Sequence, residues 1–115
     1  MENTFDNGKI AVGLRTARAA AGWNQQEFAE RMGVAKSTVA RIETLEMAAR
    51  GDFIIKAIRL FRDAGVDMDL SDPHELPITV SKSGLSVAIN ALGDQTKRRS
   101  DRKSGIASLL HDDND

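Results

Sequence analysis

The sequence predicts a mainly α fold of four to five helices, followed by a short β-hairpin extension and a mobile tail. Three observations support this. Apolar residues recur at helical spacing in four stretches between residues 9 and 65. From Val66 apolar and polar residues alternate, which is typical of half-exposed strands. From Gly93 onward the chain is dense in charge and poor in apolar residues, a composition typical of mobile segments.

These changes in pattern divide the chain into four segments. We expect a flexible N-terminus over residues 1–8 and a helical domain over residues 9–65. Residues 66–92 then form a β extension, which we expect to take part in dimerisation. Residues 93–115 form a charged tail that we expect to be disordered.

The first predicted helix covers about residues 9–21, preceded by Gly8 or Asn7. Gly22 fits as its left-handed terminator, because glycine adopts positive φ without a Cβ clash. Trp23 follows, and we expect it to fill the core beneath this helix. The apolar positions of the helix recur at helical spacing and are Ile10, Leu14, Ala17 and Ala21.

Residues 25–43 contain two short apolar-periodic helices that almost touch. Asn24 is suited to cap the first helix, with Glu27 completing a capping box. Gly33 lies between the helices, where the chain must turn within about three residues. Two helices joined by such a turn form a helix-turn-helix. Their inward-facing residues are Phe28, Ala29 and Met32 in the first helix, and Val39 and Ile42 in the second.

Seven positions in this segment agree with one known family. Their order resembles the Cro/repressor-type (XRE family) DNA-binding domain of bacterial and phage regulators, which implies a lambda-repressor-like fold. The alternative is a plain helical hairpin in a small bundle. The matching residues are Gln25, Ala29, Gly33, Val34, Val39, Ile42 and Glu43.

The resemblance implies three kinds of functional residue. Lysine and arginine can donate to guanine O6 and N7, and serine can bond to either kind of base edge. The family's other contacts are to phosphate, and an arginine on its first helix pairs with the glutamate that ends the recognition helix. Position by position, the base contacts fall on Lys36, Ser37 and Arg41, the phosphate contacts on Gln25 and Thr38, and the ion pair on Arg18 and Glu43.

The recognition helix is predicted over residues 35–45. After Glu43 the sequence departs from the family pattern, so either this helix continues by a turn or a longer loop follows. Asp52 is a candidate N-cap for a fourth helix over about residues 53–64, and Gly65 closes it.

The extension is predicted to contain strands. Residues 66–70 alternate apolar and acidic side chains, and residues 78–89 read as two β-prone runs around a turn at residues 82–84. A two-stranded hairpin is marginal alone. It must therefore pack on the helices or add to a partner's sheet, and we favour a dimer made by these strands.

Charge is unevenly distributed along the chain. The net charge is −1, but residues 9–50 hold seven basic and four acidic side chains, a local balance of +3. Residues 63–75 hold five acidic side chains and no lysine or arginine. Local sign matters more than the total for a surface that faces phosphate. Five basic residues of the tail could also touch phosphate or could simply be solvated: Lys97, Arg98, Arg99, Arg102 and Lys103.

Composition argues against metal and redox sites. The chain has no cysteine, so it has no disulfide framework and no thiolate metal site. His74 and His111 are isolated, and we expect neither a metal nor another cofactor. In the tail, residues 106–110 could form one helical turn against a partner.

Together these features predict a sequence-specific double-stranded DNA-binding transcription regulator, a repressor that acts as a homodimer on a palindromic operator. The alternative is an antitoxin or anti-activator that binds a protein partner through its C-terminal extension and uses its helix-turn-helix for autoregulation. No catalytic residues are expected, because the sequence has no set suited to catalysis. No signal peptide or membrane span is evident, so we expect a cytoplasmic protein.

Overall fold

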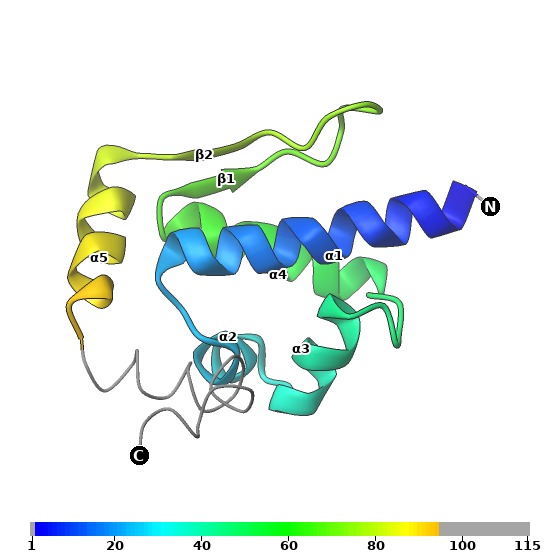
Figure 1. Ribbon diagram of the computed structural model, residues 1–115, viewed down its shortest axis with the longest axis horizontal. Coiled ribbons are helices and arrows are strands. Elements are labelled where there is room, and N and C mark those ends of the chain that lie inside the picture. Colours follow the sequence, from blue (N-terminus) through cyan, green and yellow to red (C-terminus); the bar gives the residue numbers. More distant parts are fainter. Residues whose placement is uncertain (1, 95–115) are drawn as a thin grey trace, which may run out of the picture.

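The computed structural model describes residues 2–94 and places α1 at its centre. Figure 1 shows α1 and α4 side by side in the middle layer. The β-hairpin lies on one side of this layer, and α2 and α3 lie on the other. Helix α5 lies across one end of the molecule. The helices are α1 (Glu2–Ala21), α2 (Gln25–Met32), α3 (Lys36–Glu43), α4 (Gly51–Asp63) and α5 (Lys82–Leu92), and the strands are β1 (Val66–Met68) and β2 (Ile78–Val80).

The mainly helical fold class is confirmed, but the first helix is longer than predicted. The predicted start at Lys9 is wrong, because α1 begins at Glu2 and runs through Gly8. Gly22 ends the helix with a φ of 81°, as expected. The sequence misled here because Phe5 is the one large apolar residue among residues 2–8, too few to show the apolar periodicity from which a helix is predicted.

The core is built around stacked aromatic rings. The Trp23 ring centroid lies 5.7 Å from that of Phe61, and the Phe28 centroid lies 5.1 Å from that of Phe61. Phe53 meets Phe28 edge-on at 6.2 Å. Trp23 is buried, so the expectation that it fills the core is confirmed. These rings join α2, α4 and the turn after α1 into one core. The aliphatic residues buried around them include Leu14, Ala17, Val39, Ala57 and Val66.

The fourth helix starts slightly earlier than predicted. It begins at Gly51, and its N-cap is Arg50 rather than Asp52. The Asp52 carboxylate instead accepts a hydrogen bond from the N–H of Phe53, at 2.9 Å. At the other end Gly65 adopts a φ of 84° and reverses the chain into β1, as expected.

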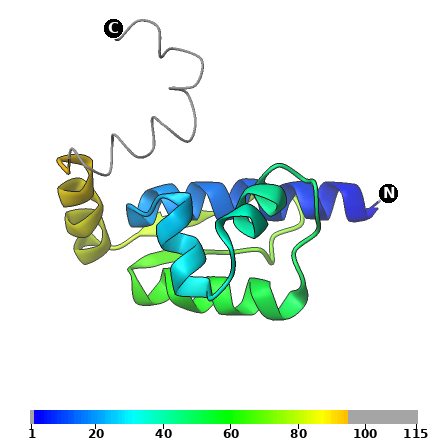
Figure 2. The same cartoon turned by 90° about the horizontal axis from the view of Figure 1, so that it is seen from below.

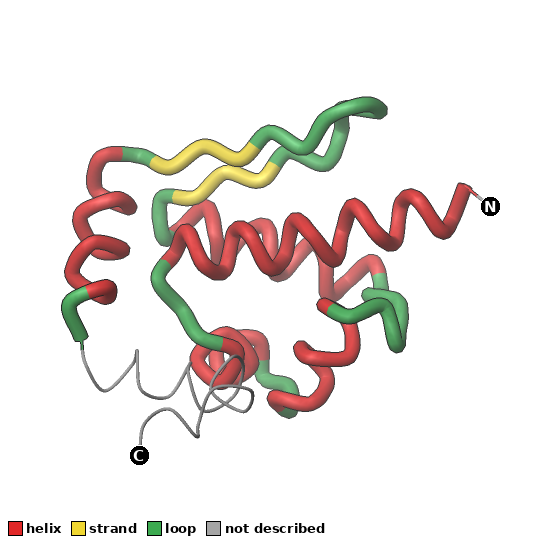
Figure 3. Tube along the Cα trace, in the orientation of Figure 1, coloured by secondary structure: helices red, strands yellow, loops and turns green. Residues whose placement is uncertain are grey.

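The strands predicted within residues 66–70 and at the start of residues 78–89 are confirmed, but they pair with each other, whereas the hairpin was predicted within residues 78–89. Strands β1 and β2 pair antiparallel within one chain, with Val66 opposite Val80 and Met68 opposite Ile78. The tube in Figure 3 shows two short strands joined by a long loop. In that loop, Asp69 Oδ1 accepts hydrogen bonds from the hydroxyl and the N–H of Ser71, which lower the pKa of the Asp69 carboxyl.

The predicted second strand over residues 85–89 is wrong, since these residues belong to α5. The Ser81 hydroxyl accepts a hydrogen bond from the N–H of Gly84 at 3.1 Å and caps this helix. In a helix, the same stretch of sequence places three small residues on one face: Gly84, Ala88 and Ala91. That face packs closely on the end of α1, because a Cβ at Gly22 would lie 3.0 Å from the Cβ of Ala91. It also packs closely on the residue after α4, because a Cβ at Gly84 would lie 2.8 Å from the carbonyl oxygen of Ala64.

Candidate nucleic-acid interface

The turn between α2 and α3 sets the angle of the second helix. Gly33 ends α2 in the left-handed region with a φ of 75° and a ψ of 31°. The N–H of Val34 donates to the carbonyl of Ala29 at 3.0 Å, which closes the turn. Lys56 of α4 reaches across and donates to the carbonyl of Met32 at 3.1 Å. The turn is therefore fixed by its own backbone and by one side chain from outside the motif.

Burial on one side of α3 leaves the other side free. Val39 and Ile42 are buried against Phe28 and Ala29 of α2, so the orientation of α3 about its axis is fixed. All three predicted base-contacting residues are exposed on the other side of α3, whereas Thr38, a predicted phosphate contact, is half-buried. Figure 2, seen from below, shows α2 and α3 lying on the same face of α1. The exposed set is Lys36, Ser37 and Arg41.

The start of α2 is capped by side chains, whereas the start of α3 is not. Asn24 accepts a hydrogen bond from the N–H of Glu27 at 2.8 Å, and the Glu27 carboxylate accepts one from the N–H of Asn24 at 2.9 Å. The predicted capping box is thus confirmed. Ala35 precedes α3 and has no side-chain acceptor. The N–H of Thr38 donates to the carbonyl of Ala35 at 3.0 Å, so the first-turn amides that remain for an external anion are those of Lys36 and Ser37.

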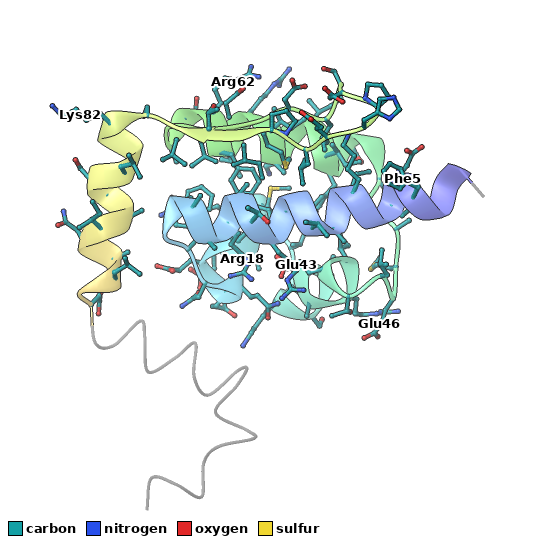
Figure 4. All side chains as sticks on the ribbon, turned by 45° about the horizontal axis from the view of Figure 1, so that its top comes forward. Phe5, Arg18, Glu43, Glu46, Arg62 and Lys82 are labelled. Carbon is teal, nitrogen blue, oxygen red and sulfur yellow. The ribbon has the colours of Figure 1, made fainter. Side chains whose placement is uncertain are left out.

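The carboxylate of Glu43 ties three helices together. Arg18 Nε donates to Glu43 Oε2 at 2.8 Å, and Arg18 Nη2 donates to Glu43 Oε1 at 3.1 Å. Gln25 Nε2 donates to Glu43 Oε1 at 3.1 Å, and Arg18 Nη1 donates to the carbonyl of Trp23 at 3.1 Å. Figure 4 shows Arg18 and Glu43 facing each other beneath α1. This network links α1, the start of α2 and the end of α3.

The sequence left open whether α3 continues by a turn after Glu43 or is followed by a longer loop. The helix ends at Glu43, and residues 44–50 form a loop rather than an extra helical turn. Leu45 in this loop has a φ of 65°, a left-handed conformation that is uncommon for a non-glycine residue.

Comparison with known families agrees with this geometry. A family model described as helix-turn-helix matches residues 14–62. The match starts within α1, includes all of α2, the turn and α3, and ends within α4. Residues 14–62 thus match a helix-turn-helix family model, and this match supports a DNA-binding transcription regulator of the Cro/repressor (XRE) type. No curated protein and no solved structure shows a significant match.

Exposed charges surround the recognition helix of this helix-turn-helix domain. The Arg41 guanidinium lies 3.9 Å from the Glu46 carboxylate, and both side chains are more than half exposed. Exposed pairs of this kind contribute only about 0–1 kcal/mol, so Glu46 holds the Arg41 side chain only weakly. Arg31 is differently engaged, because its guanidinium lies 4.4 Å from the centre of the Trp23 ring.

Two side chains of the domain have roles that the sequence did not reveal. Lys56 and Met32 are 24 residues apart, and nothing in the pattern of α4 indicates a lysine that caps α2. Gln25 was predicted from the family to contact phosphate, but one of its amide hydrogens is donated to Glu43. Its second amide hydrogen remains for another acceptor. The basic run at residues 97–103 and the helical turn predicted over residues 106–110 lie outside the described residues.

One further negative finding concerns membranes. Within residues 2–94, no helix combines the length and the apolar character that a membrane span requires.

Proposed function

We propose that this protein is a sequence-specific repressor that binds a palindromic operator in double-stranded DNA as a homodimer. One observation carries this proposal: α3 presents Lys36, Ser37 and Arg41 to solvent while its opposite side is held in the core. The major groove of B-DNA admits an α-helix and offers a distinct donor and acceptor pattern for each base pair. Because its ligand is bacterial or phage DNA, we propose that it acts in the cytoplasm.

Each exposed side chain has a proposed role. Lys36 and Arg41 donate to guanine O6 and N7, and Ser37 bonds to whichever base edge lies opposite. Gln25 and Thr38 contact phosphate, together with the uncapped amides at the start of α3. The phosphate contacts set the register of the domain on the duplex, and the base contacts supply the specificity.

The homodimer follows from how such sites are read. A single eight-residue helix reaches only a few base pairs. Two copies related by a two-fold axis read two half-sites about 34–36 Å apart, one turn of DNA. Repression follows if the dimer covers a promoter. This function requires no catalytic residue, metal or cofactor.

The test is a footprint on the DNA upstream of the protein's own gene, followed by binding measurements on the protected site. Arg41→Ala is expected to weaken binding by about 1–3 kcal/mol and to relax the preference at one base position. The loss arises because a donor pair to one guanine is removed. Binding to the site and to its single-base variants is measured by fluorescence anisotropy at fixed salt, since salt alone changes affinity.

A matched control is Arg62→Ala. Arg62 is an exposed arginine on α4, and Figure 4 shows it on the opposite side of the molecule from Glu43 and Glu46. The control should leave affinity and base preference unchanged. An equal loss on every sequence would mean that Arg41 contacts only the backbone. The absence of any protected sequence would contradict the proposed function itself.

A further inference from the structure

Helix α1 carries a second apolar stripe that faces solvent. Phe5, Gly8 and Val12 recur at intervals of three and four residues, on the side of the helix opposite Leu14 and Ala17. Phe5 is 60% exposed and Val12 is 54% exposed, whereas Leu14 and Ala17 are fully buried. Nothing lies within 4 Å of where a Cβ at Gly8 would be. Helix α1 thus has apolar residues on two sides, and only the side with Leu14 and Ala17 packs on the core.

This stripe forms the floor of an open groove of about 600 Å³. Residues 43–45 form one wall, directly after α3, and residues 74–76 form the other. Lys9 holds the second wall in place by donating to the carbonyl of Asp72. Figure 4 shows Phe5 near the N-terminal end of α1, on the same end of the molecule as Glu46 in the loop after α3.

Leu45 adds an apolar side chain to this groove from a strained backbone. Its φ of 65° is a conformation that costs a leucine free energy, and the side chain is nevertheless 54% exposed. Within one copy, the strain is not compensated by burial of the side chain. Strained residues that persist in this way point to a function for the exposed group.

The groove also carries unpaired charges of both signs. Arg15 and Glu75 both line it. Within residues 2–94, neither the guanidinium of Arg15 nor the carboxylate of Glu75 has a hydrogen-bond or ion-pair partner. A surface with an apolar centre and both signs of charge at its rim is suited to contact an identical surface turned through a two-fold axis.

We propose that this groove is the contact surface for a second copy of the chain, with Arg15 of one copy paired to Glu75 of the other. The proposal rests on the homodimer of the proposed function and names its interface. Because one wall continues directly from α3, pairing here brings the two recognition helices close to the symmetry axis. Half-sites one turn of DNA apart require that closeness.

The opposite end of the molecule is less suited to this role. Helix α5 also exposes apolar residues, among them Leu85, Ile89 and Leu92, but Lys82 is its one charged residue. In Figure 1, α3 lies beneath the middle of α1, and in both Figure 1 and Figure 2 α5 lies at the far end of α1. Pairing through α5 would therefore place the two recognition helices farther apart. Of the extension, only the loop between β1 and β2 would take part in the proposed interface.

The test is a charge reversal in the full chain. Arg15→Glu and Glu75→Arg each place like charges opposite each other at two symmetric positions, so each should raise the dimer dissociation constant by about tenfold or more. The double variant restores opposite charges and should return the constant to within about threefold of the wild type. Mass is measured by analytical ultracentrifugation over a range of concentrations. Arg59→Glu, an exposed arginine of α4 outside the groove, is the matched control and should have no effect.

A second variant guards against a purely structural effect. Leu45→Gly removes the apolar side chain and also relieves the left-handed backbone. The melting temperature should therefore hold or rise while dimerisation is lost. A fall in melting temperature with the dimer intact would mean that Leu45 serves only the fold, and it would overturn the proposal.

The remaining outcomes separate this interface from the proposed function. Binding to a single half-site reports the helix-turn-helix alone and should be the same in wild type, Leu45→Gly and the double reversal. A wild type that stays monomeric even on the full palindrome overturns the interface but leaves DNA binding intact. A dimer that resists both single reversals but is broken by Ile89→Lys assigns the contact to α5 and likewise overturns the proposal. A dimer that binds no duplex supports the interface and overturns the proposed function.

Discussion

Helices α3 and α5 are both short, yet they are held in place by different kinds of contact. Helix α3 is fixed by side chains: Val39 and Ile42 are buried in the core, and Glu43 accepts hydrogen bonds from two other helices. Helix α5 is fixed by close approach of backbones, and Gly84 is the one residue of α5 that is fully buried. A Cβ at Gly84 would lie 2.8 Å from the carbonyl oxygen of Ala64.

This difference fits the proposal that α3, rather than α5, reads DNA. A helix that presents a row of side chains to DNA must be held against rotation about its own axis, and specific side-chain contacts do that. Close packing of small residues fixes the distance between two helices. It places few constraints on the orientation of the side chains that surround the contact. We therefore expect the loss of α3 contacts to destabilise the whole fold and the loss of α5 contacts to destabilise α5 alone.

The largest effect is expected from Arg18→Ala. This change leaves the Glu43 carboxylate, whose side chain is 2% exposed, with Gln25 as its remaining side-chain donor. Removing one partner of a buried pair costs about 3–5 kcal/mol, because an uncompensated charge stays buried. Urea denaturation followed by circular dichroism measures the loss. Arg62→Ala, which breaks the exposed pair with Asp67, is the control and should cost less than about 1 kcal/mol. A loss from Arg18→Ala as small as the control's would mean that α3 does not depend on the buried pair.

A smaller and local effect is expected from Gly84→Ala. The added Cβ would lie 2.8 Å and 3.0 Å from the backbone oxygens of Ala64 and Gly65, which cannot move aside cheaply. Overpacking of this kind costs about 1–3 kcal/mol, and here it should detach α5. Hydrogen exchange should show faster exchange in residues 82–92 alone, with half-site affinity unchanged. Gly51→Ala, where the space is open and which lies outside the groove, is the matched control and should stabilise α4 slightly. Global unfolding by Gly84→Ala would show that α5 belongs to the same cooperative unit as α3.

The same difference determines how much could be predicted from the sequence. The turn at Gly33 and the capping box at Asn24 were predicted because each requires a particular residue type at a particular spacing. Helix α5 was missed because Leu85, Val87 and Ile89 alternate as in a strand, while the contacts that hold the helix involve small residues far away in sequence. Periodicity cannot show that Gly22 and Gly65 need close neighbours.

For a related reason, the exposed residues of α3 could be predicted from the sequence, whereas the groove beside α1 could not. The exposed set on α3 could be placed by helical spacing once Val39 and Ile42 were assigned to the core. The groove beside α1 could not, because its walls come from residues 43–45 and 74–76, which only the folded chain brings together. The sequence also gave no sign that Leu45 adopts a left-handed backbone.

The same interaction, a side-chain N-cap, occurs in both regions: at the start of α2, which supports α3, and at the start of α5. Asn24 accepts from the N–H of Glu27 at 2.8 Å, and Ser81 accepts from the N–H of Gly84 at 3.1 Å. Replacing either cap with alanine should cost about 1 kcal/mol. Asn24→Ala should lower the midpoint of global unfolding and also weaken DNA binding, because α2 supports α3. Ser81→Ala should change exchange only in α5. Equal effects on DNA binding would remove the distinction between the regions.

An effect on stability about as small as that of either cap is expected at Lys56, which helps fix α3 although it lies in neither region. Its ammonium donates to the carbonyl of Met32 and stabilises the turn before α3. Lys56→Met should cost about 0.5–1.5 kcal/mol of stability, the net value of one hydrogen bond. Its effect on DNA affinity should be larger in proportion, because the turn sets the angle of the recognition helix.

A direct contact between Lys56 and phosphate would also lower affinity, and the two causes can be separated. Lys56→Gln keeps an N–H donor without the charge, so it should retain most of the affinity if the turn is what matters. If Lys56 instead neutralises a phosphate, both variants should weaken binding equally on all sequences and reduce the salt slope by about one. Binding measured at several salt concentrations decides between these causes. An unchanged slope with restored affinity in Lys56→Gln would show that α4 tunes recognition through the turn.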